Sequence, residues 1–284
     1  MTSMKKLPKY KFYPSLLDKF QQYIDLDYEN YWLMDTSGRW HKNYDESTGE
    51  YILPADKLEE HAKKELIMAI NREGTDISMA ADKGSVFNEI VDCIIMKKKS
   101  IRSDISILSS KSYYIDKSEI THPCIYGKMH DFEFVFDKTL CTQAANYFKD
   151  SLCQVYTDGI LGTSYGDVLL YGYIDYLRED KVYDAKTTKH YEFGKFQNYW
   201  QKHVYPYTLI ESGKCTNIAS FEYSVFLLKG GTDKQPLISG SFYPEVYVYD
   251  HDDSRKRLRY ICEHFIEFLQ ENKSLIKDRK IFGE

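Results

Sequence analysis

The chain has 284 residues, of which 43% are hydrophobic and 29% charged, so it can bury a core and is not disordered by composition. Its formal net charge of −5 argues against a general nucleic-acid coat protein, but it leaves room for an enzyme with a local basic groove. The six cysteines are scattered without a CxxC spacing, which favours a reduced, cytoplasmic protein. Because no apolar run is long enough for a membrane helix and residues 1–15 contain no apolar signal segment, we expect no membrane contact.

The first part of the chain is predicted to be mainly helical. A helix that opens at Ser15 is expected within residues 12–34, followed by a turn-rich hairpin at 36–54 and a helix at 55–72. We expect residues 1–80 to form an extension that wraps the core of a single domain spanning the whole chain.

A further helix is predicted at residues 82–100, with one apolar stripe formed by Val86, Phe87, Ile90, Val91, Ile94 and Ile95. The segment 100–136 has no clear period and is left unassigned.

The second half alternates between helices and strands. Helices are expected at 137–150, 192–212 and 253–272, and strands at 152–158, 167–177, 181–187, 220–229 and 242–250. A tight turn, "REDK", joins the second and third strands. This order predicts an α/β (or α+β) fold with a central mixed β-sheet flanked by helices.

Two aspartates and a lysine are the strongest chemical signal. Asp184 and Lys186 share one face of a strand, and a hairpin about the "REDK" turn would bring Asp175 close to Asp184. Two neighbouring carboxylates repel each other unless a cation lies between them, and Mg²⁺ typically takes one or two carboxylates. An Asp-x-Lys tripeptide on an edge strand is also common as a solvated face, and this alternative stays open.

Four segments in order give these residues a wider context: "YPSLLDKF", "GSVFNEIVD", "GYIDYL…KVYDAKTT" and "QKHVY". Together they resemble the PD-(D/E)XK nuclease superfamily, in its RecB-type and phage-exonuclease-like branch. The resemblance implies a restriction-endonuclease-like core.

The resemblance also implies roles for individual residues. Asp175 and Asp184 would be metal ligands, the carbonyl of Ala185 a further ligand, and Lys186 the catalytic lysine. Gln201 and Tyr205, one helical turn apart, would lie beside the active site, although an ordinary amphipathic helix is the alternative.

The sequence departs from the family pattern on the helix at 82–100. Asn88 stands where RecB-type domains carry a metal-binding histidine, and the adjacent Glu89 could supply a carboxylate instead. We lean towards Glu89 as the metal ligand, with a surface position as its alternative. Some relatives hold an iron–sulfur cluster through cysteines near the C-terminus, where this chain has only Cys262, so we expect no iron–sulfur cluster.

The sequence therefore predicts a deoxyribonuclease dependent on Mg²⁺ or Mn²⁺, acting from DNA ends in recombination, repair or a phage. Its expected partner is DNA, and the family also allows a recombination or helicase partner protein. The alternatives are a catalytically weak binding subunit of the same fold, a site-specific endonuclease and an RNA-directed nuclease. The aromatic residues Tyr199, Trp200 and Tyr205 are candidates for gripping DNA. The oligomeric state stays open.

Overall fold

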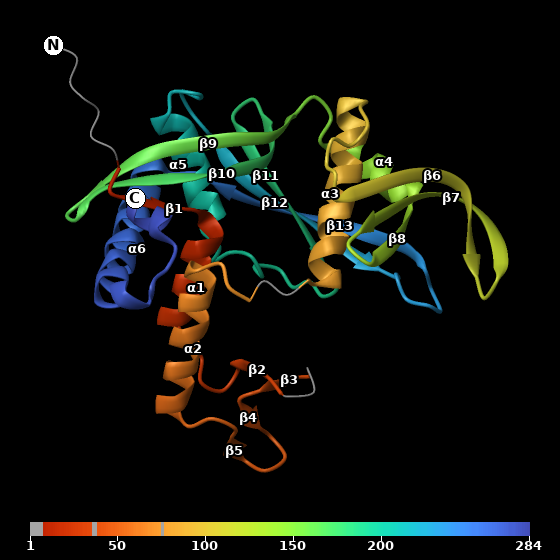
Figure 1. The fold of residues 1–284 in the computed structure, drawn as a ribbon. Helices are drawn as coiled ribbons and strands as arrows, with labels where there is room; N and C mark the ends of the chain where they lie inside the picture. Colours follow the sequence, from red (N-terminus) through yellow and green to blue (C-terminus); the bar gives the residue numbers. More distant parts are fainter. Residues whose placement is uncertain (1–7, 36–38, 75–76) are drawn as a thin grey trace.

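The computed structural model describes residues 8–35, 39–74 and 77–284. It is an α/β structure with a large mixed sheet flanked by helices (Figure 1). The described residues form the helices α1 (Pro14–Ile24), α2 (Ala55–Ile70), α3 (Met79–Met96), α4 (Lys138–Tyr147), α5 (Gln201–Glu211) and α6 (His251–Glu271). Two short 3-10 helices, Lys273–Leu275 and Arg279–Phe282, follow α6.

The main sheet has nine strands in the order β1-β10-β11-β12-β13-β8-β7-β6, and β9 pairs with the other edge of β10. Its strands are β1 (Tyr10–Phe12), β6 (Ile105–Ile115), β7 (Ser118–Met129), β8 (Phe132–Asp137), β9 (Leu152–Thr163), β10 (Gly166–Arg178), β11 (Lys181–Thr188), β12 (Ser220–Lys229) and β13 (Leu237–Val248). The β1–β10, β11–β12 and β8–β13 pairs are parallel and the others antiparallel, so the predicted mixed sheet is confirmed.

Two hydrophobic cores cover the opposite faces of the central strands. On β12, Phe221 and Tyr223 belong to the core under α1, α5 and α6, whereas Phe226 and Leu228 belong to the core under α3 and α4. Since side chains alternate along a strand, the sheet is buried on both sides by helices. This arrangement fixes α3 and α5 on opposite faces of β11, the strand that carries Asp184.

Close backbone approaches seat α3 against the sheet. A β-carbon at Gly84 would lie 2.6 Å from Thr187 Oγ1 of β11, and one at Gly127 of β7 would lie 2.1 Å from Val86 Cγ1. Only glycine leaves room for these contacts. The helix is therefore fixed between β11 and the β6–β8 strands.

Helix α1 is shorter than predicted, and Ser15 does not cap it. The helix spans Pro14–Ile24, with Tyr13 as the N-cap and Pro14 at the first helical position, where a missing N–H costs nothing. The expected continuation to residue 34 was wrong, because the Asp27 side chain accepts hydrogen bonds from the Glu29 and Asn30 amides. Such a turn competes with a helix.

Helix α5 begins at Gln201, not near residue 192 as predicted. Residues before it form a loop tied to β13, since the buried Glu245 carboxylate accepts hydrogen bonds from the Gly194 amide at 2.9 Å and from the Tyr191 hydroxyl. Gly194 also has a φ of +82°, outside the helical region.

The remaining helix predictions are confirmed within a few residues, while several strands are longer than expected. The unassigned segment 100–136 forms the antiparallel strands β6, β7 and β8. Strand β9 extends to Thr163, and β13 begins at Leu237.

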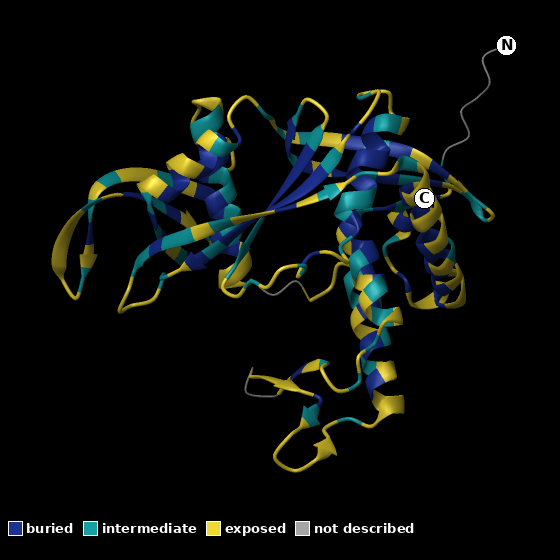
Figure 2. Cartoon of the chain, turned by 180° about the vertical axis from the view of Figure 1, so that it is seen from behind, coloured by how far each residue is buried: buried dark blue, intermediate teal, exposed yellow. Residues whose placement is uncertain are grey.

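The N-terminal region contains β1, α1 and α2, which contribute Phe12, Leu17 and Leu66 to the larger core. Four short strands between α1 and α2 form two small hairpins, in line with the turn-rich hairpin expected there: β2 (Trp32–Met34), β3 (Trp40–Lys42), β4 (Tyr44–Asp45) and β5 (Glu50–Tyr51). Figure 2 shows that they are mostly exposed.

Residues 36–38 of the expected hairpin and residues 1–7 lie outside the described residues. Among the helices that are described, none has both the length and the apolar composition to cross a membrane. The division into a single domain with an extension at 1–80 stays a prediction.

The α3–β7 contact yields a stability test. Gly127→Ala should lower the free energy of unfolding by about 1–3 kcal/mol, because the new methyl group overlaps Val86. In the Val86→Ala background the same change should cost much less, because the clashing methyl is gone. Urea unfolding of the four proteins measures the coupling, and strictly additive losses would show that the two residues do not contact.

Candidate active site

The hairpin predicted about the "REDK" turn is confirmed and brings Asp175 beside Asp184. The β10–β11 ladder pairs Arg178 with Lys181 and ends at the pair Tyr176–Tyr183. Beyond that pair, the Asp175 Oδ2 atom accepts a hydrogen bond of 2.8 Å from the Ala185 amide. At this point the Asp175 side chain, and not the backbone of β10, accepts the hydrogen bond from β11. The Asp175 carboxylate therefore lies between β10 and β11.

Strand β10 is also interrupted on its other edge at Asp175. Its neighbours Ile174 and Tyr176 pair with β9, but no pair joins Asp175 to Gln154 across the same ladder. Gln154 has a φ of +51°, an uncommon conformation for a residue with a side chain.

The interruption changes the faces of β10. Ile174 and Leu177 face one core, whereas Tyr176 faces the other. The strand thus turns at Asp175, and its carboxylate lies where the two cores meet.

Asp184, Lys186 and Gln201 form a closed ring of polar contacts. Lys186 Nζ lies 2.7 Å from Asp184 Oδ2 and donates to Gln201 Oε1 at 2.7 Å, while Gln201 Nε2 donates to Asp184 Oδ1 at 2.7 Å. The rings of Tyr199 and Tyr223 lie 5.6 and 5.7 Å from the ammonium group. This ring of contacts holds the lysine in one position.

Tyr205 packs against the glycine of the "GYID" segment. A β-carbon at Gly172 would lie 2.8 Å from Tyr205 Cε1, so the tyrosine occupies the space that this glycine leaves. Burial raises the pKa of the Tyr205 hydroxyl, and the charges of Asp184 and Asp175 raise it further. Gln201 and Tyr205 therefore both lie beside the acidic pair, and their role at an active site stays a prediction.

The acidic pair carries an electrostatic strain. Burial, followed by the charge of Asp184, raises the pKa of Asp175 to about 7. Burial also raises the pKa of Asp184, although Lys186 opposes that effect. Burial alone would lower the pKa of Lys186, but Asp184, Asp175 and Asp18 together raise it, so the lysine stays cationic. The site holds more negative charge than Lys186 neutralises.

Sequence reasoning missed two further acids near this pair. Asp92 of α3 is buried, and its charge helps to raise the pKa of Asp175. Gln154 Nε2 donates to Asp92 Oδ2 at 3.1 Å, whereas the buried Asp92 Oδ1 has no hydrogen-bond partner. Burial raises the pKa of Asp92 to about 6. The available signal was its spacing, one helical turn after Asn88.

The second missed acid is Asp18 of α1. Its Oδ1 atom accepts a hydrogen bond of 2.7 Å from the Trp200 amide at the start of α5. Burial raises its pKa to about 6, and both Lys186 and Asp184 act on its charge. Asp18 therefore connects α1 to the helix that carries Gln201.

Asn88 and Glu89 point to different surroundings. Asn88 Oδ1 is buried without a hydrogen-bond partner, whereas the Glu89 carboxylate accepts a contact of 3.7 Å from Cys93 Sγ. Within the described ranges, no hydrogen bond or ion pair joins either residue to Asp175 or Asp184. The assignment of a ligand on α3 thus stays a prediction, and Asp92 joins Asn88 and Glu89 as a candidate.

The oxygen atoms present fit a hard divalent cation with few protein ligands. Residues 8–35, 39–74 and 77–284 contain no group of three or more His, Cys, Asp or Glu side chains arranged to hold a metal ion. Mg²⁺ usually keeps several waters and takes only one or two carboxylates. Asp175 and Asp184, with the Ala185 carbonyl, could hold Mg²⁺ or Mn²⁺, and the orphaned Asp92 Oδ1 could accept from a bound water.

Comparisons with known proteins add little. No protein-family model matches the sequence, and no curated protein does. A solved structure described as "Crystal structure of SSO0001" is 12% identical, with a TM-score of 0.30. The alignment covers 46% of this chain and 55% of the other, so the chain spans about half the length of that structure. A likeness of this size carries no argument.

Removing the charge of Asp175 and removing the charge of Asp184 should change the melting temperature in opposite directions. In metal-free protein at about pH 8, Asp175→Asn should raise the melting temperature by roughly 2–4 °C, because it removes a buried like charge worth about 1 kcal/mol or more. Asp184→Asn should lower it, because Lys186 loses its ion-pair partner. Thermal unfolding followed by circular dichroism measures both shifts.

The pH dependence supplies the control. Because the folded-state pKa of Asp175 is raised, its contribution to stability is present at low pH and is lost as the pH rises through about 7. The gain from Asp175→Asn should therefore shrink as the pH falls below about 7 and disappear near about pH 4, the pKa of an aspartate in the unfolded chain. A gain that is equal at both pH values would refute the repulsion.

Proposed function

We propose that the chain is a metal-dependent nuclease with a restriction-endonuclease-like core of the PD-(D/E)XK type. The observation that carries the proposal is the convergence of Asp175, Asp184 and Lys186 at the point where β10 and β11 separate, with Gln201 bridging the last two. Two acids and a fixed cation suit hydrolysis of a phosphodiester, which needs charge stabilisation and a placed water.

Each residue has a distinct task in this proposal. Asp175 and Asp184 would hold Mg²⁺ or Mn²⁺, and that ion would supply charge stabilisation and a more acidic water at the scissile phosphate. Lys186 remains protonated and offsets the negative charge of that phosphate. Gln201 and Asp184 hold the ammonium group in position through their contacts of 2.7 Å.

The surrounding residues fix this geometry. Tyr205 fills the space over Gly172, and Asp18 anchors the start of α5. Asp92, whose carboxylate interacts with Gln154 and with the Tyr176 hydroxyl, lies close enough to act on the charge of Asp175 and could orient a water. DNA is the proposed substrate.

Two lysines of β11, Lys186 and Lys181, each form an ion pair with a buried acid and allow a matched test of catalysis. Lys186→Ala should reduce Mg²⁺-dependent cleavage of DNA by about 100-fold or more, because the phosphate charge is no longer offset. It should also lower stability, since Asp184 is left buried without its partner. The measurement is nucleotide release under conditions in which circular dichroism shows a folded protein.

Lys181→Ala is the control. Lys181 lies on the same strand and forms an ion pair of the same length, 2.7 Å, with the buried Glu222. Lys181→Ala should lower the free energy of unfolding about as much as Lys186→Ala does, but it should leave cleavage intact. Equal loss of cleavage in both variants, or cleavage by the wild type in excess EDTA, would reject the proposed mechanism. DNA binding without any cleavage would favour the binding-subunit alternative.

The proposal includes action from DNA ends. Matched linear and covalently closed circular DNA, incubated with Mg²⁺, should differ: the linear form releases acid-soluble nucleotides and the closed circle is largely spared. Discrete fragments from the circle would instead favour a site-specific endonuclease. A single-stranded RNA of the same length, degraded faster than either DNA, would favour the RNA-directed alternative.

A further inference from the structure

Two of the three aromatic residues expected to grip DNA are buried and the third, Tyr199, is partly buried, whereas other tyrosines are exposed. Trp200 and Tyr205 are part of the larger core. By contrast, Tyr173 of β10 is 60% exposed and Tyr156 of β9 is 40% exposed, with ring centroids 5.3 Å apart. Figure 1 shows α5 and α6 beside one face of these strands. The exposed rings belong to the opposite face.

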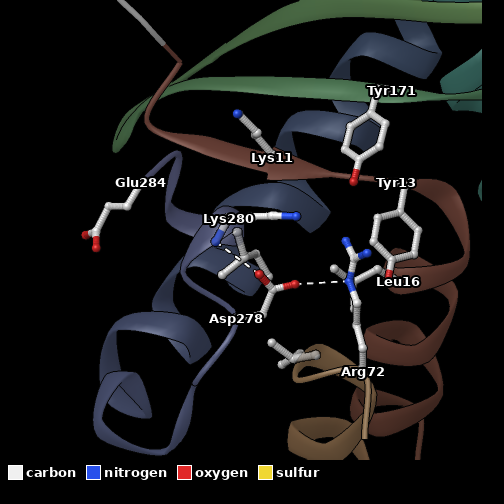
Figure 3. Close-up of a pocket in the computed structure, with 10 residues that line it drawn as sticks. Lys11, Tyr13, Leu16, Arg72, Tyr171, Asp278, Lys280 and Glu284 are labelled. Carbon is white, nitrogen blue, oxygen red and sulfur yellow. Dashed lines mark hydrogen bonds and ion pairs between the residues drawn. The ribbon is translucent and has the colours of Figure 1, made fainter. Parts of the chain in front are cut away.

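This aromatic face continues to a cavity at the end of β1. Tyr171 and Tyr13, whose ring centroids are 5.9 Å apart, line a cavity of about 280 Å³. Three basic side chains, Lys11, Arg72 and Lys280, come to the same cavity from β1, the end of α2 and the C-terminal segment (Figure 3). A flat ring beside clustered cations is the chemistry of a nucleotide site.

The cavity retains free positive charge. Arg72 Nε lies 3.0 Å from Asp278 Oδ2, and its guanidinium carbon lies 6.0 Å from the centre of the Tyr13 ring, with the group beside Tyr13 and Tyr171 in Figure 3. Among the described residues, no acid lies within ion-pair distance of Lys11 or Lys280. The other acid of the cavity, Glu284, is paired with Arg279. An anion entering the cavity therefore meets cations that are not yet neutralised.

The walls of the cavity are fixed before any ligand binds. Asn71 Nδ2 donates to the Leu275 carbonyl at 3.0 Å, and Asn71 Oδ1 accepts from the Lys277 amide at 2.6 Å. Arg72 has a φ of +57°, a strained conformation for a residue with a side chain. These contacts hold the end of α2 against the C-terminal segment and aim Arg72 at the cavity.

The cavity is lined by a residue of β10, the strand that also carries Asp175. Tyr171 precedes Asp175 by four residues on β10, a distance of about 13 Å along a strand. Tyr173 lies between them. A strand of nucleic acid bound along the face opposite α5 would thus pass Tyr173 and Tyr171 between the break of β10 at Asp175 and the cavity.

We propose that a single strand of nucleic acid binds this surface, with bases stacked on Tyr173 and Tyr171 and one phosphate held by Arg72, Lys11 and Lys280. A single strand is favoured over a duplex because exposed aromatic rings stack only on bases whose faces are free. One acid on the aromatic face, Asp158, already accepts a hydrogen bond from the Tyr156 hydroxyl. This inference rests on the proposed function, because it makes the surface a track for the strand that is cut.

The test is binding without catalysis. Fluorescence anisotropy of a labelled dT oligonucleotide in EDTA gives the dissociation constant for wild-type protein and variants. Tyr173→Ala should raise it about tenfold, the effect of losing one stacked base. Tyr114→Ala is the matched control, because Tyr114 is 61% exposed but belongs to β6, and it should leave binding unchanged.

Lys280→Gln should weaken binding of every oligonucleotide and reduce the salt slope by about 1, whereas Lys98→Gln, just after the end of α3, should not. If the cavity takes a terminal phosphate, removing that phosphate weakens wild-type binding and has no effect on Lys280→Gln. If it takes an internal phosphate, removal has no effect on either protein. Both results are consistent with a phosphate bound in the cavity, and they distinguish a terminal phosphate from an internal one.

Unchanged binding in Tyr173→Ala and Lys280→Gln would overturn the inference, as would a duplex of the same length that binds more tightly and does not respond to Tyr173→Ala. The proposed function fails separately, since it requires Mg²⁺-dependent cleavage that depends on Lys186. If the wild type cleaves DNA and Tyr173→Ala binds the oligonucleotide normally, the nuclease proposal stands and the proposed binding surface is rejected.

Discussion

The interruption of β10 at Asp175 is the constraint on which the candidate site depends. In a regular strand, backbone groups form the hydrogen bonds to both neighbouring strands. Here the Asp175 carboxylate accepts the hydrogen bond from the Ala185 amide, and the side chains of β10 on the two sides of Asp175 alternate in opposite register between the two cores. The result places two acidic side chains close together in a buried setting, where their repulsion has to be balanced. Lys186 balances part of it, and the remaining negative charge is what a divalent cation would neutralise.

The rest of the fold holds that arrangement in place from both sides of the sheet. Gly172 admits Tyr205 of α5, and Gly84 lets α3 approach β11. Asp18 joins α1 to the start of α5. These contacts position α5 against β11. Gln201 of α5 can therefore hold Lys186 and Asp184 of β11 in one closed ring of polar contacts.

Much of this could be predicted from the sequence, because helical periodicity and a tight turn are local signals. The stripe on α3 and the hairpin that joins Asp175 to Asp184 follow from such signals. The start of α5 depends on a distant carboxylate, Glu245, and the strands β6–β8 alternate too weakly to be recognised. Asp92 and Asp18 were missed because their importance comes from tertiary proximity. Asp18 belongs to no spacing motif, and Asp92 is marked only by its position one helical turn after Asn88.

The most direct test of the central account is calorimetric titration of Mn²⁺ into the wild-type protein and into Asp175→Asn. The account predicts saturable binding to the wild type that is lost or weakened at least about tenfold in Asp175→Asn, because the variant keeps the shape of the site but loses one anionic ligand. Glu222→Gln, which alters a buried acid paired with Lys181, should bind Mn²⁺ like the wild type. Equal affinity in the wild type and Asp175→Asn, or no binding to the wild type, would contradict it.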